Sequence, residues 1–359
     1  PSARTGGVFT VYMATVAAGG TDANSGLSAQ QPVTTLARVQ QILQQNKPHS
    51  DVEVRIRQGR YASPPLGDWH TYIPGHTISF MPADYKYGDG IADIAGRPVF
   101  DNPRASGGGY ASGWWLVAKL PGDPADPMHN GGTSGLRFYY LAVQHYNGGI
   151  SLWGDSGHDT TDNTYNPPLR SQPTPGLNGN TIYGMAFQWI GTKYVGGTFG
   201  YGAVLLTDSS NNRIDNNHFT QVENSGSLAG LIHGVYVTHF SSSNQIDNND
   251  FTTISSDPVK LRDRSSNNNI QGNTFRQAGR NSFYREEFCD TQCAAANAKA
   301  RECASYHNRF AYNHDLSSYG GATIPAWSLS PSSNTATGAA PCSIPAGATR
   351  LHTAGNSTT

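Results

Sequence analysis

Lys260 stands midway between two tyrosines, with Tyr236 24 residues before it and Tyr284 24 residues after it. Arg262 and Arg264 follow the lysine at alternate positions of the same segment. A lysine amine beside other cations can act as a general base, and a phenol can give or take a proton. Guanidinium groups bind carboxylates. These residue types predict proton abstraction from a substrate that carries a carboxylate.

Three copies of one sequence unit bring these side chains together. The copies cover residues 202–219, 234–251 and 258–275, and each joins a short apolar strand to a Ser/Asn turn. The shared aliphatic, asparagine and phenylalanine positions are Ile214, Ile246 and Ile270; Asn217, Asn249 and Asn273; Phe219, Phe251 and Phe275. Such a repeat is typical of a solenoid. Stacked aliphatic residues with an asparagine ladder predict an all-β fold, a single-stranded right-handed parallel β-helix. Residues in register on adjacent coils are then direct neighbours, about 4.8 Å apart.

Alternation along each strand separates core positions from solvent-facing positions. It places Tyr236, Lys260 and Tyr284 in one outward column. The same parity turns Arg285 inward, and Arg285 therefore ranks below Tyr284 as a proton donor. Either tyrosine can be acid or base, and His233 can substitute for them. The catalytic candidates are Lys260, Tyr284, Tyr236 and Arg285, and the substrate-binding candidates are Arg262, Arg264, His233 and Arg280.

An amphipathic segment near the N-terminus predicts the lid that the first coil needs. Residues 31–47 can form a helix that begins at Thr34 or Thr35 and places Leu36 and Leu43 on its apolar face. We expect residues 1–50 to hold an N-terminal strand and this capping helix, and residues 51–318 to form the parallel β-helix with inserted loops. Residues 319–359 are expected to be an irregular C-terminal segment packed on the solenoid.

Composition excludes several classes of partner. The 359 residues carry a formal net charge of −1 with only 14% charged residues, so nucleic acid is not an expected partner. No apolar run is long enough to cross a membrane. The four cysteines, at positions 289, 293, 303 and 342, predict two disulfides in a secreted protein, with three pairings open. We expect a monomer.

Residues 255–288, SSDPVKLRDRSSNNNIQGNTFRQAGRNSFYREEF, resemble the catalytic coils of right-handed β-helix polysaccharide lyases of the alginate and chondroitin types. The resemblance implies β-elimination on a uronic-acid-containing polysaccharide, with Arg285 as the proton donor by family analogy. It also implies a possible Ca²⁺ requirement. Asp257 and Asp263 are the acidic residues near the predicted site. We therefore assign no cofactor and no metal-binding residues from the sequence.

Two other classes stay open. A β-helix glycoside hydrolase would need paired carboxylates, for which Asp208, Asp257 and Asp263 are the candidates. A noncatalytic carbohydrate-binding solenoid would use exposed aromatic residues as stacking platforms. The candidates for that role are Trp114, Trp115, Trp153 and Tyr201. Exposed lysine and arginine on a solenoid can also be a solvated charge ladder without function.

Overall fold

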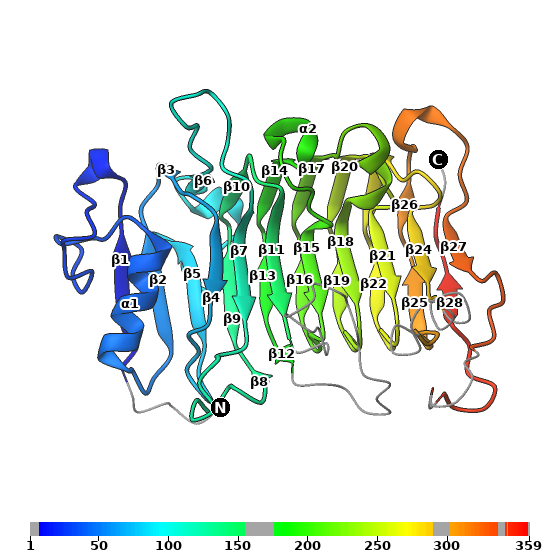
Figure 1. Ribbon diagram of the computed structural model, residues 1–359, viewed down its shortest axis with the longest axis horizontal. Helices are drawn as coiled ribbons and strands as arrows, with labels where there is room; N and C mark the ends of the chain where they lie inside the picture. Colours follow the sequence, from blue (N-terminus) through cyan, green and yellow to red (C-terminus); the bar gives the residue numbers. More distant parts are fainter. Residues whose placement is uncertain (1–6, 155–175, 290–301, 337–341, 343, 358–359) are drawn as a thin grey trace.

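The computed structural model describes residues 7–154, 176–289, 302–336, 342 and 344–357. Within these residues the chain winds as a parallel β-helix whose coils visit three long parallel sheets in turn, here named sheets A, B and C (Figure 1). The predicted fold is confirmed. Successive coils pair in register, for example Ile182 with Ile214, Ile214 with Ile246, and Ile246 with Ile270.

The strands of sheet A run along the whole solenoid. They are β1 (Phe9–Met13), β2 (Val52–Ile56), β5 (Ile78–Pro82), β9 (Leu136–Tyr139), β13 (Thr181–Tyr183), β16 (Arg213–Asp215), β19 (Gln245–Asp247), β22 (Asn269–Gln271), β25 (Asn308–Ala311) and β28 (Leu351–Ala354). Sheet B contains β3 (Arg60–Ala62), β6 (Val99–Asp101), β10 (Ala142–Gln144), β14 (Ala186–Ile190), β17 (His218–Val222), β20 (Asp250–Ile254), β23 (Thr274–Ala278) and β26 (His314–Asp315).

Sheet C carries most of the predicted site. Its strands are β4 (Leu66–Trp69), β7 (Trp114–Lys119), β11 (Gly148–Trp153), β15 (Gly202–Thr207), β18 (His233–Thr238), β21 (Val259–Arg262), β24 (Tyr284–Glu287) and β27 (Trp327–Ser330). A short pair, β8 (Gly132–Thr133) and β12 (Leu177–Asn178), lies apart from the three sheets. Turns between sheets B and C hold α2 (Thr192–Val195) and the 3-10 helices η3 (Gly226–Leu231) and η5 (Tyr319–Gly321). Two further 3-10 helices are η1 (Val16–Ala18) and η2 (Ile91–Asp93).

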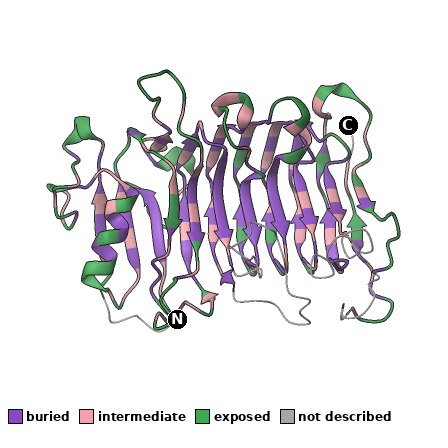
Figure 2. Cartoon of the chain, in the orientation of Figure 1, coloured by how far each residue is buried: buried purple, intermediate pink, exposed green. Residues whose placement is uncertain are grey.

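Columns of like side chains fill the interior. The rings of Phe187, Phe219, Phe251 and Phe275 stack with centroids 5.2, 4.7 and 5.2 Å apart. These rings and the isoleucine column are fully buried. Figure 2 shows that burial follows the strands, while the exposed residues concentrate in the turns and on the N-terminal helix. The core is therefore one continuous stack rather than a globular centre.

An asparagine ladder closes the corner between sheets A and B. The backbone N–H of Asn217 donates to Asn249 Oδ1 at 3.0 Å, and the N–H of Asn249 donates to Asn273 Oδ1 at 2.9 Å. The ladder continues through Asn313 to Asn356. Backbone groups at this bend have no ladder partner of their own, so the buried side-chain amides satisfy them. The predicted ladder role of Asn217, Asn249 and Asn273 is confirmed.

The two ends of the chain extend this solenoid. Helix α1 (Leu36–Asn46) lies at the N-terminal end, and Thr35 Oγ1 accepts a hydrogen bond from the Arg38 N–H at 3.1 Å, as a helix cap should (Figure 1). The expected irregular segment after residue 318 instead contains β27 and β28, which pair with β24 and β25.

Cys303 and Cys342 form a disulfide, and Cys289 is also disulfide-bonded. Within the described residues, no helix has the length and apolar character needed to span a membrane.

The ladder predicts a large loss of stability when one rung is removed. Asn249→Ala takes away the acceptor of the Asn217 N–H and the donor to the Ile214 carbonyl, which lies at 2.9 Å. Two buried groups are left without partners, so the free energy of unfolding should fall by about 2–5 kcal/mol in urea titrations. Gln245→Ala, on the outer face of the same coil, should change it by less than about 0.5 kcal/mol. Equal effects of the two substitutions would contradict this role of the ladder.

Asp315 predicts a pH-dependent term in stability. It pairs with Phe275 and continues the phenylalanine column, where both carboxylate oxygens are buried and have no hydrogen-bond partner in the described part of the chain. Burial raises the pKa of Asp315 to about 7. The neutral carboxyl is therefore the form that the fold favours. The pKa of an aspartate in the unfolded chain is near 4, so stability is complete below pH 4 and is lost as the pH rises through about 7.

Asp315→Asn keeps the neutral shape and removes the titration. Its free energy of unfolding should match wild type at pH 4 and exceed it at pH 8 by on the order of 2–4 kcal/mol. The measurement is urea unfolding of both proteins across this pH range. A constant difference between the two proteins would contradict the assignment.

Candidate active site

The outward column of sheet C brings together three of the four predicted catalytic side chains. Tyr236 on β18 pairs with Lys260 on β21, and Lys260 pairs with Arg285 on β24. The Lys260 ammonium lies 5.6 Å from the centre of the Tyr236 ring. The predicted neighbours Tyr236 and Lys260 are therefore confirmed, but the third member of the column is Arg285.

Tyr284 is the main correction to the predicted site. It pairs with Val259, is fully buried, and its hydroxyl donates to Glu286 Oε2 at 3.1 Å. The coil from Lys260 to Arg285 holds 25 residues, whereas the prediction extended the 24-residue step. A slip of one residue exchanges the inner and outer faces of a strand. Tyr284 consequently belongs to the core, and Arg285, predicted to point inward, belongs to the outer face.

Glu287 gathers the three cations of this face. Its Oε1 lies 2.8 Å from Lys260 Nζ and 3.6 Å from Arg262 Nη1, and its Oε2 lies 3.1 Å from Arg285 Nε. Burial raises the pKa of Glu287, but Lys260, Arg285 and Arg262 lower it by more, so the net shift is downward. The carboxylate is ionised and marks where a carboxylate group can meet three positive charges.

A second carboxylate fixes the position of Arg262. Arg262 Nε donates to Glu302 Oε1 and Oε2 at 2.8 and 2.9 Å, and the Cys289 N–H donates to Glu302 Oε2 at 2.9 Å. Burial lowers the pKa of Arg262, while Tyr236, Glu302 and Glu287 raise it by more. The guanidinium is therefore a permanent, preoriented charge. The sequence prediction missed Glu287 and Glu302. Glu287 lies two residues after Arg285 on the same strand, so the alternation of strand faces could have placed it beside Arg285. Glu302 comes 40 residues after Arg262, and no repeat in the sequence places it there.

His233 and Tyr236 supply uncharged polar groups beside the cations. The two rings lie 5.1 Å apart, and both residues are buried. His233 Nδ1 donates to the Asp257 carbonyl at 2.6 Å, which leaves Nε2 without the proton. Burial and the nearby Lys260 lower the pKa of His233 to about 3. Burial raises the pKa of Tyr236 to about 12. At neutral pH the site therefore holds a neutral imidazole and a protonated phenol.

The remaining predicted residues lie outside this cluster. Arg264 binds Asp263 with bonds of 2.7 and 2.8 Å and covers the Phe240 ring at 4.3 Å. Arg280 is exposed and lies beside Gly230 of η3. Their proposed contacts with substrate stay predictions.

The aspartates proposed for hydrolysis have structural partners. Asp257 Oδ1 accepts the N–H groups of Asn281 and Ser282 at 2.7 and 3.1 Å. Asp263 accepts from His239, Arg264 and the Cys303 N–H. Asp208 is buried as well. Asp257 and Asp263 therefore hold turns together, and all three aspartates are buried rather than open to a cleft.

One group of residues has the composition of a metal site. One ligand atom each from His239, Asp263 and Glu302 lies within 4.8 Å of the others. Arg264 and Arg262 already bind the two carboxylates. Ca²⁺ requires six to eight oxygen ligands, so a set with one imidazole and two arginine-bound carboxylates does not fit it. The possible Ca²⁺ requirement gains no site from this cluster.

Two solved structures share the fold. An alginate lyase from Paenibacillus sp. str. FPU-7 has a TM-score of 0.50 and 13% sequence identity, covering 97% of this chain and 95% of that chain. A rhamnogalacturonan lyase has a TM-score of 0.51 and 14% identity, covering 89% of this chain and 73% of that chain. No family model and no curated protein sequence matches the chain. At these identities the similarity establishes the parallel β-helix.

The geometry predicts that His233 does not titrate in the physiological range. Its imidazole should remain in the neutral Nδ1–H form from pH 5 to pH 8, because burial and Lys260 oppose a second proton. Heteronuclear NMR of ¹⁵N-histidine-labelled protein reads the tautomer directly. An imidazolium signal from His233 near pH 6 would contradict this assignment.

Proposed function

We propose that the protein is a polysaccharide lyase that cleaves a uronic-acid-containing polysaccharide by β-elimination at the cluster of Tyr236, Lys260, Arg262 and Arg285. The observation that carries the proposal is the convergence of an ammonium and two guanidinium groups on one carboxylate, Glu287, beside a protonated phenol. A site with this charge arrangement suits a uronate carboxylate, and its neighbouring hydroxyl supplies a proton donor.

The reaction has three requirements. The uronate carboxylate must be neutralised so that its neighbouring C5–H becomes acidic, and Arg262 and Arg285 can do this by charge-assisted hydrogen bonds. Lys260 first releases its ammonium proton to solvent and then, as the free amine, takes the C5 proton. The electron pair of that bond forms the C4=C5 double bond as the C4–O4 bond breaks. Tyr236 gives its proton to the departing O4. The Tyr236 phenolate then takes a proton from water and Lys260 releases one to water before the next turnover, so atoms and charge balance.

The fold and covalent structure support this reading. Two lyases of polysaccharides share the parallel β-helix. The Cys303–Cys342 disulfide suits an oxidising compartment, so we include secretion in the proposal. An acidic polysaccharide is the proposed partner, and the monomeric state stays a prediction.

Elimination is tested by the ultraviolet absorbance of its unsaturated uronate product. The substrate panel is alginate, polygalacturonate, glucuronan and glycosaminoglycans. We expect the absorbance to rise on one of them. Lys260→Ala and Tyr236→Phe should each lower kcat/KM by about 100-fold or more, as for loss of a general base or acid.

Tyr284→Phe is the matched control, since it removes the same hydroxyl from a fully buried tyrosine two coils away from Tyr236. It should leave kcat/KM within about threefold and cost about 1 kcal/mol of stability through the bond to Glu286. No absorbance on any acidic substrate, with new reducing ends instead, would overturn β-elimination.

Hydrolysis has one observation in its favour. Burial and then Asp263 raise the pKa of Glu302, although Arg262 opposes this, whereas the cations lower that of Glu287. Both side chains contact Arg262, at 2.8 and 3.6 Å. Two carboxyls shifted in opposite directions are the pattern of an acid and a base. In this case Glu302→Gln would abolish release of reducing ends, and Lys260→Ala would retain it.

A further inference from the structure

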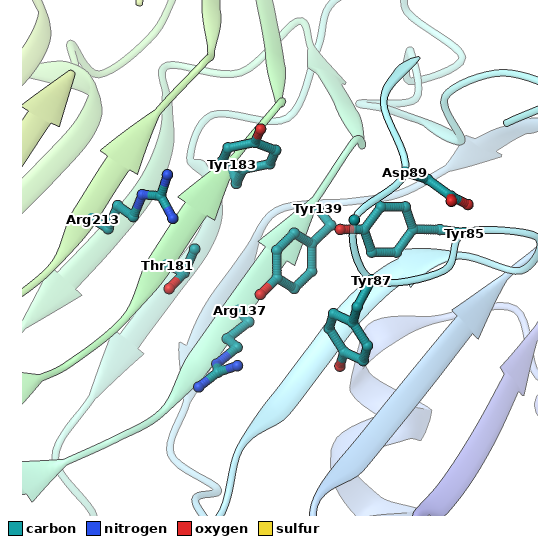
Figure 3. A pocket seen from close by; sticks show the side chains of 9 residues that line it. Tyr85, Tyr87, Asp89, Arg137, Tyr139, Thr181, Tyr183 and Arg213 are labelled. Carbon is teal, nitrogen blue, oxygen red and sulfur yellow. The ribbon is translucent and has the colours of Figure 1, made fainter. Parts of the chain in front are cut away.

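A pocket of about 420 Å³ lies on the outer face of sheet A, a different sheet from the one that carries Lys260. Figure 3 shows its walls, which are strands β9, β13 and β16 and the loop that follows β5. The volume falls in the range of small-ligand sites. Sheet A places β13, at the centre of the pocket, three strands from β22, the strand that follows Lys260. Three spacings amount to about 14 Å along the solenoid axis.

The loop wall is fixed before any ligand binds. Arg55 Nη1 donates to the Tyr85 carbonyl at 2.5 Å, and the Tyr140 hydroxyl donates to the Asp89 carbonyl at 3.2 Å. The Tyr87 hydroxyl donates to Ser79 Oγ at 3.2 Å. Hydrogen bonds from three separate parts of the chain thus hold this loop over the sheet. A preformed wall lowers the ordering cost of binding.

Tyrosine rings form the floor and one side of the pocket. Tyr85 stacks on Tyr139 with centroids 5.3 Å apart, and Tyr139 meets Tyr183 edge-on at 6.3 Å. Tyr87 covers Tyr139 from the loop at 5.8 Å and exposes 55% of its surface. Aromatic faces pack on the C–H faces of sugar rings, and phenol hydroxyls bond to sugar hydroxyls. Burial raises the pKa of Tyr85 and Tyr87, so these phenols stay protonated.

Two arginines give the pocket its charge preference. Arg137, Thr181 and Arg213 occupy one outward column on successive strands, so the two arginines are two spacings, about 9.6 Å, apart. Arg137 Nε is buried without a hydrogen-bond partner among the described residues. Arg213 pairs with Asp215 and covers the Tyr183 ring at 5.4 Å. A buried guanidinium nitrogen without an acceptor is costly, and an anionic ligand on the same guanidinium group would offset part of that cost.

Asp89 is the one carboxylate on the pocket wall, and its Oδ2 accepts the Lys86 N–H at 2.8 Å. Its position suits a sugar hydroxyl rather than a sugar carboxylate. The lining thus combines ring faces, an arginine whose Nε has no acceptor among the described residues, and an acceptor for hydroxyls. These are the contacts that an acidic sugar offers.

We propose that this pocket is a second, noncatalytic binding site for an acidic oligosaccharide, in which Tyr87 and Tyr183 pack on the sugar rings and Arg137 binds a carboxylate. The substrate class is the one in the proposed function, and the choice of an acidic glycan rests partly on that proposal. The site holds the polysaccharide on the face of sheet A while sheet C performs the chemistry. Binding at two faces raises the effective concentration of polymer at the enzyme.

Isothermal titration of Lys260→Ala protein tests the site without turnover. The probes are a purified uronate hexasaccharide from the substrate identified by the absorbance assay, alginate if none is found, and a neutral glucan hexasaccharide. We expect two uronate oligosaccharides to bind per chain and the neutral one to bind at least about tenfold more weakly. Adding Arg137→Gln and Tyr183→Ala should leave a single site, since each charge-assisted bond contributes about tenfold.

Arg309→Gln with Tyr312→Ala is the matched control. Arg309 lies in the same outward column of sheet A and covers Tyr312 at 5.3 Å, outside the pocket. This pair should leave both sites intact. Unchanged stoichiometry in the Arg137 and Tyr183 variant, or equal binding of the neutral oligosaccharide, would overturn the inference.

The outcomes separate the two proposals. Pocket-dependent binding in a protein that eliminates no substrate would retain this site and remove the lyase assignment. Elimination with no pocket-dependent binding would retain the lyase assignment and remove this site. In otherwise wild-type protein, the pocket substitutions should raise KM several-fold on polymer and leave kcat/KM on a trisaccharide unchanged.

Discussion

The asparagine ladder is the constraint on which the rest of this molecule depends. Each rung fixes one corner of a coil against the next, because a buried amide replaces the backbone partner that the bend removes. Once the corner is fixed, every residue on the following strand has a defined neighbour in the next coil. The stacking of Phe219 on Phe251 and the pairing of Tyr236 with Lys260 both follow from that register.

Register also explains how one face of the solenoid can hold three cations at strand spacing. Lys260, Arg262 and Arg285 would repel one another on an isolated sheet, and each long side chain would lose rotamer freedom. Glu287 and Glu302 offset the repulsion and orient the groups at the same time. The cluster is thus preorganised for a carboxylate. A bound uronate would share the positive charges with Glu287, and the cations would not need to move into place.

The repeat in the sequence was sufficient to predict the coils, but it did not predict correctly for every strand which side chains point inward and which point outward. Ile214, Ile246 and Ile270 gave the correct register on sheet A, and Tyr236 and Lys260 gave it on sheet C. The prediction failed at Tyr284 because coil length is not strictly constant, and the longer turn before β24 adds one residue. Such an addition is invisible when the following segment carries no isoleucine–asparagine signature. Glu302 and the pocket on sheet A were missed because both depend on segments between repeats. The loop after β5 reaches its place through Arg55 and Tyr140, which no periodicity connects.

The two faces differ in how their arginines are balanced, and that difference bears on their roles. On sheet C, Arg262 and Arg285 are held by Glu302 and Glu287, so the charges are positioned precisely and a ligand must compete for them. On sheet A, Arg137 has a buried Nε without an acceptor among the described residues, so an anionic ligand on this guanidinium competes with fewer existing bonds. Cations that are held in fixed positions can stabilise the charge that develops in a transition state. A donor without a partner instead strengthens the binding of a ground-state ligand, because the new hydrogen bond is a net gain in free energy. The same solenoid can therefore hold a polymer on one sheet and act on it from another.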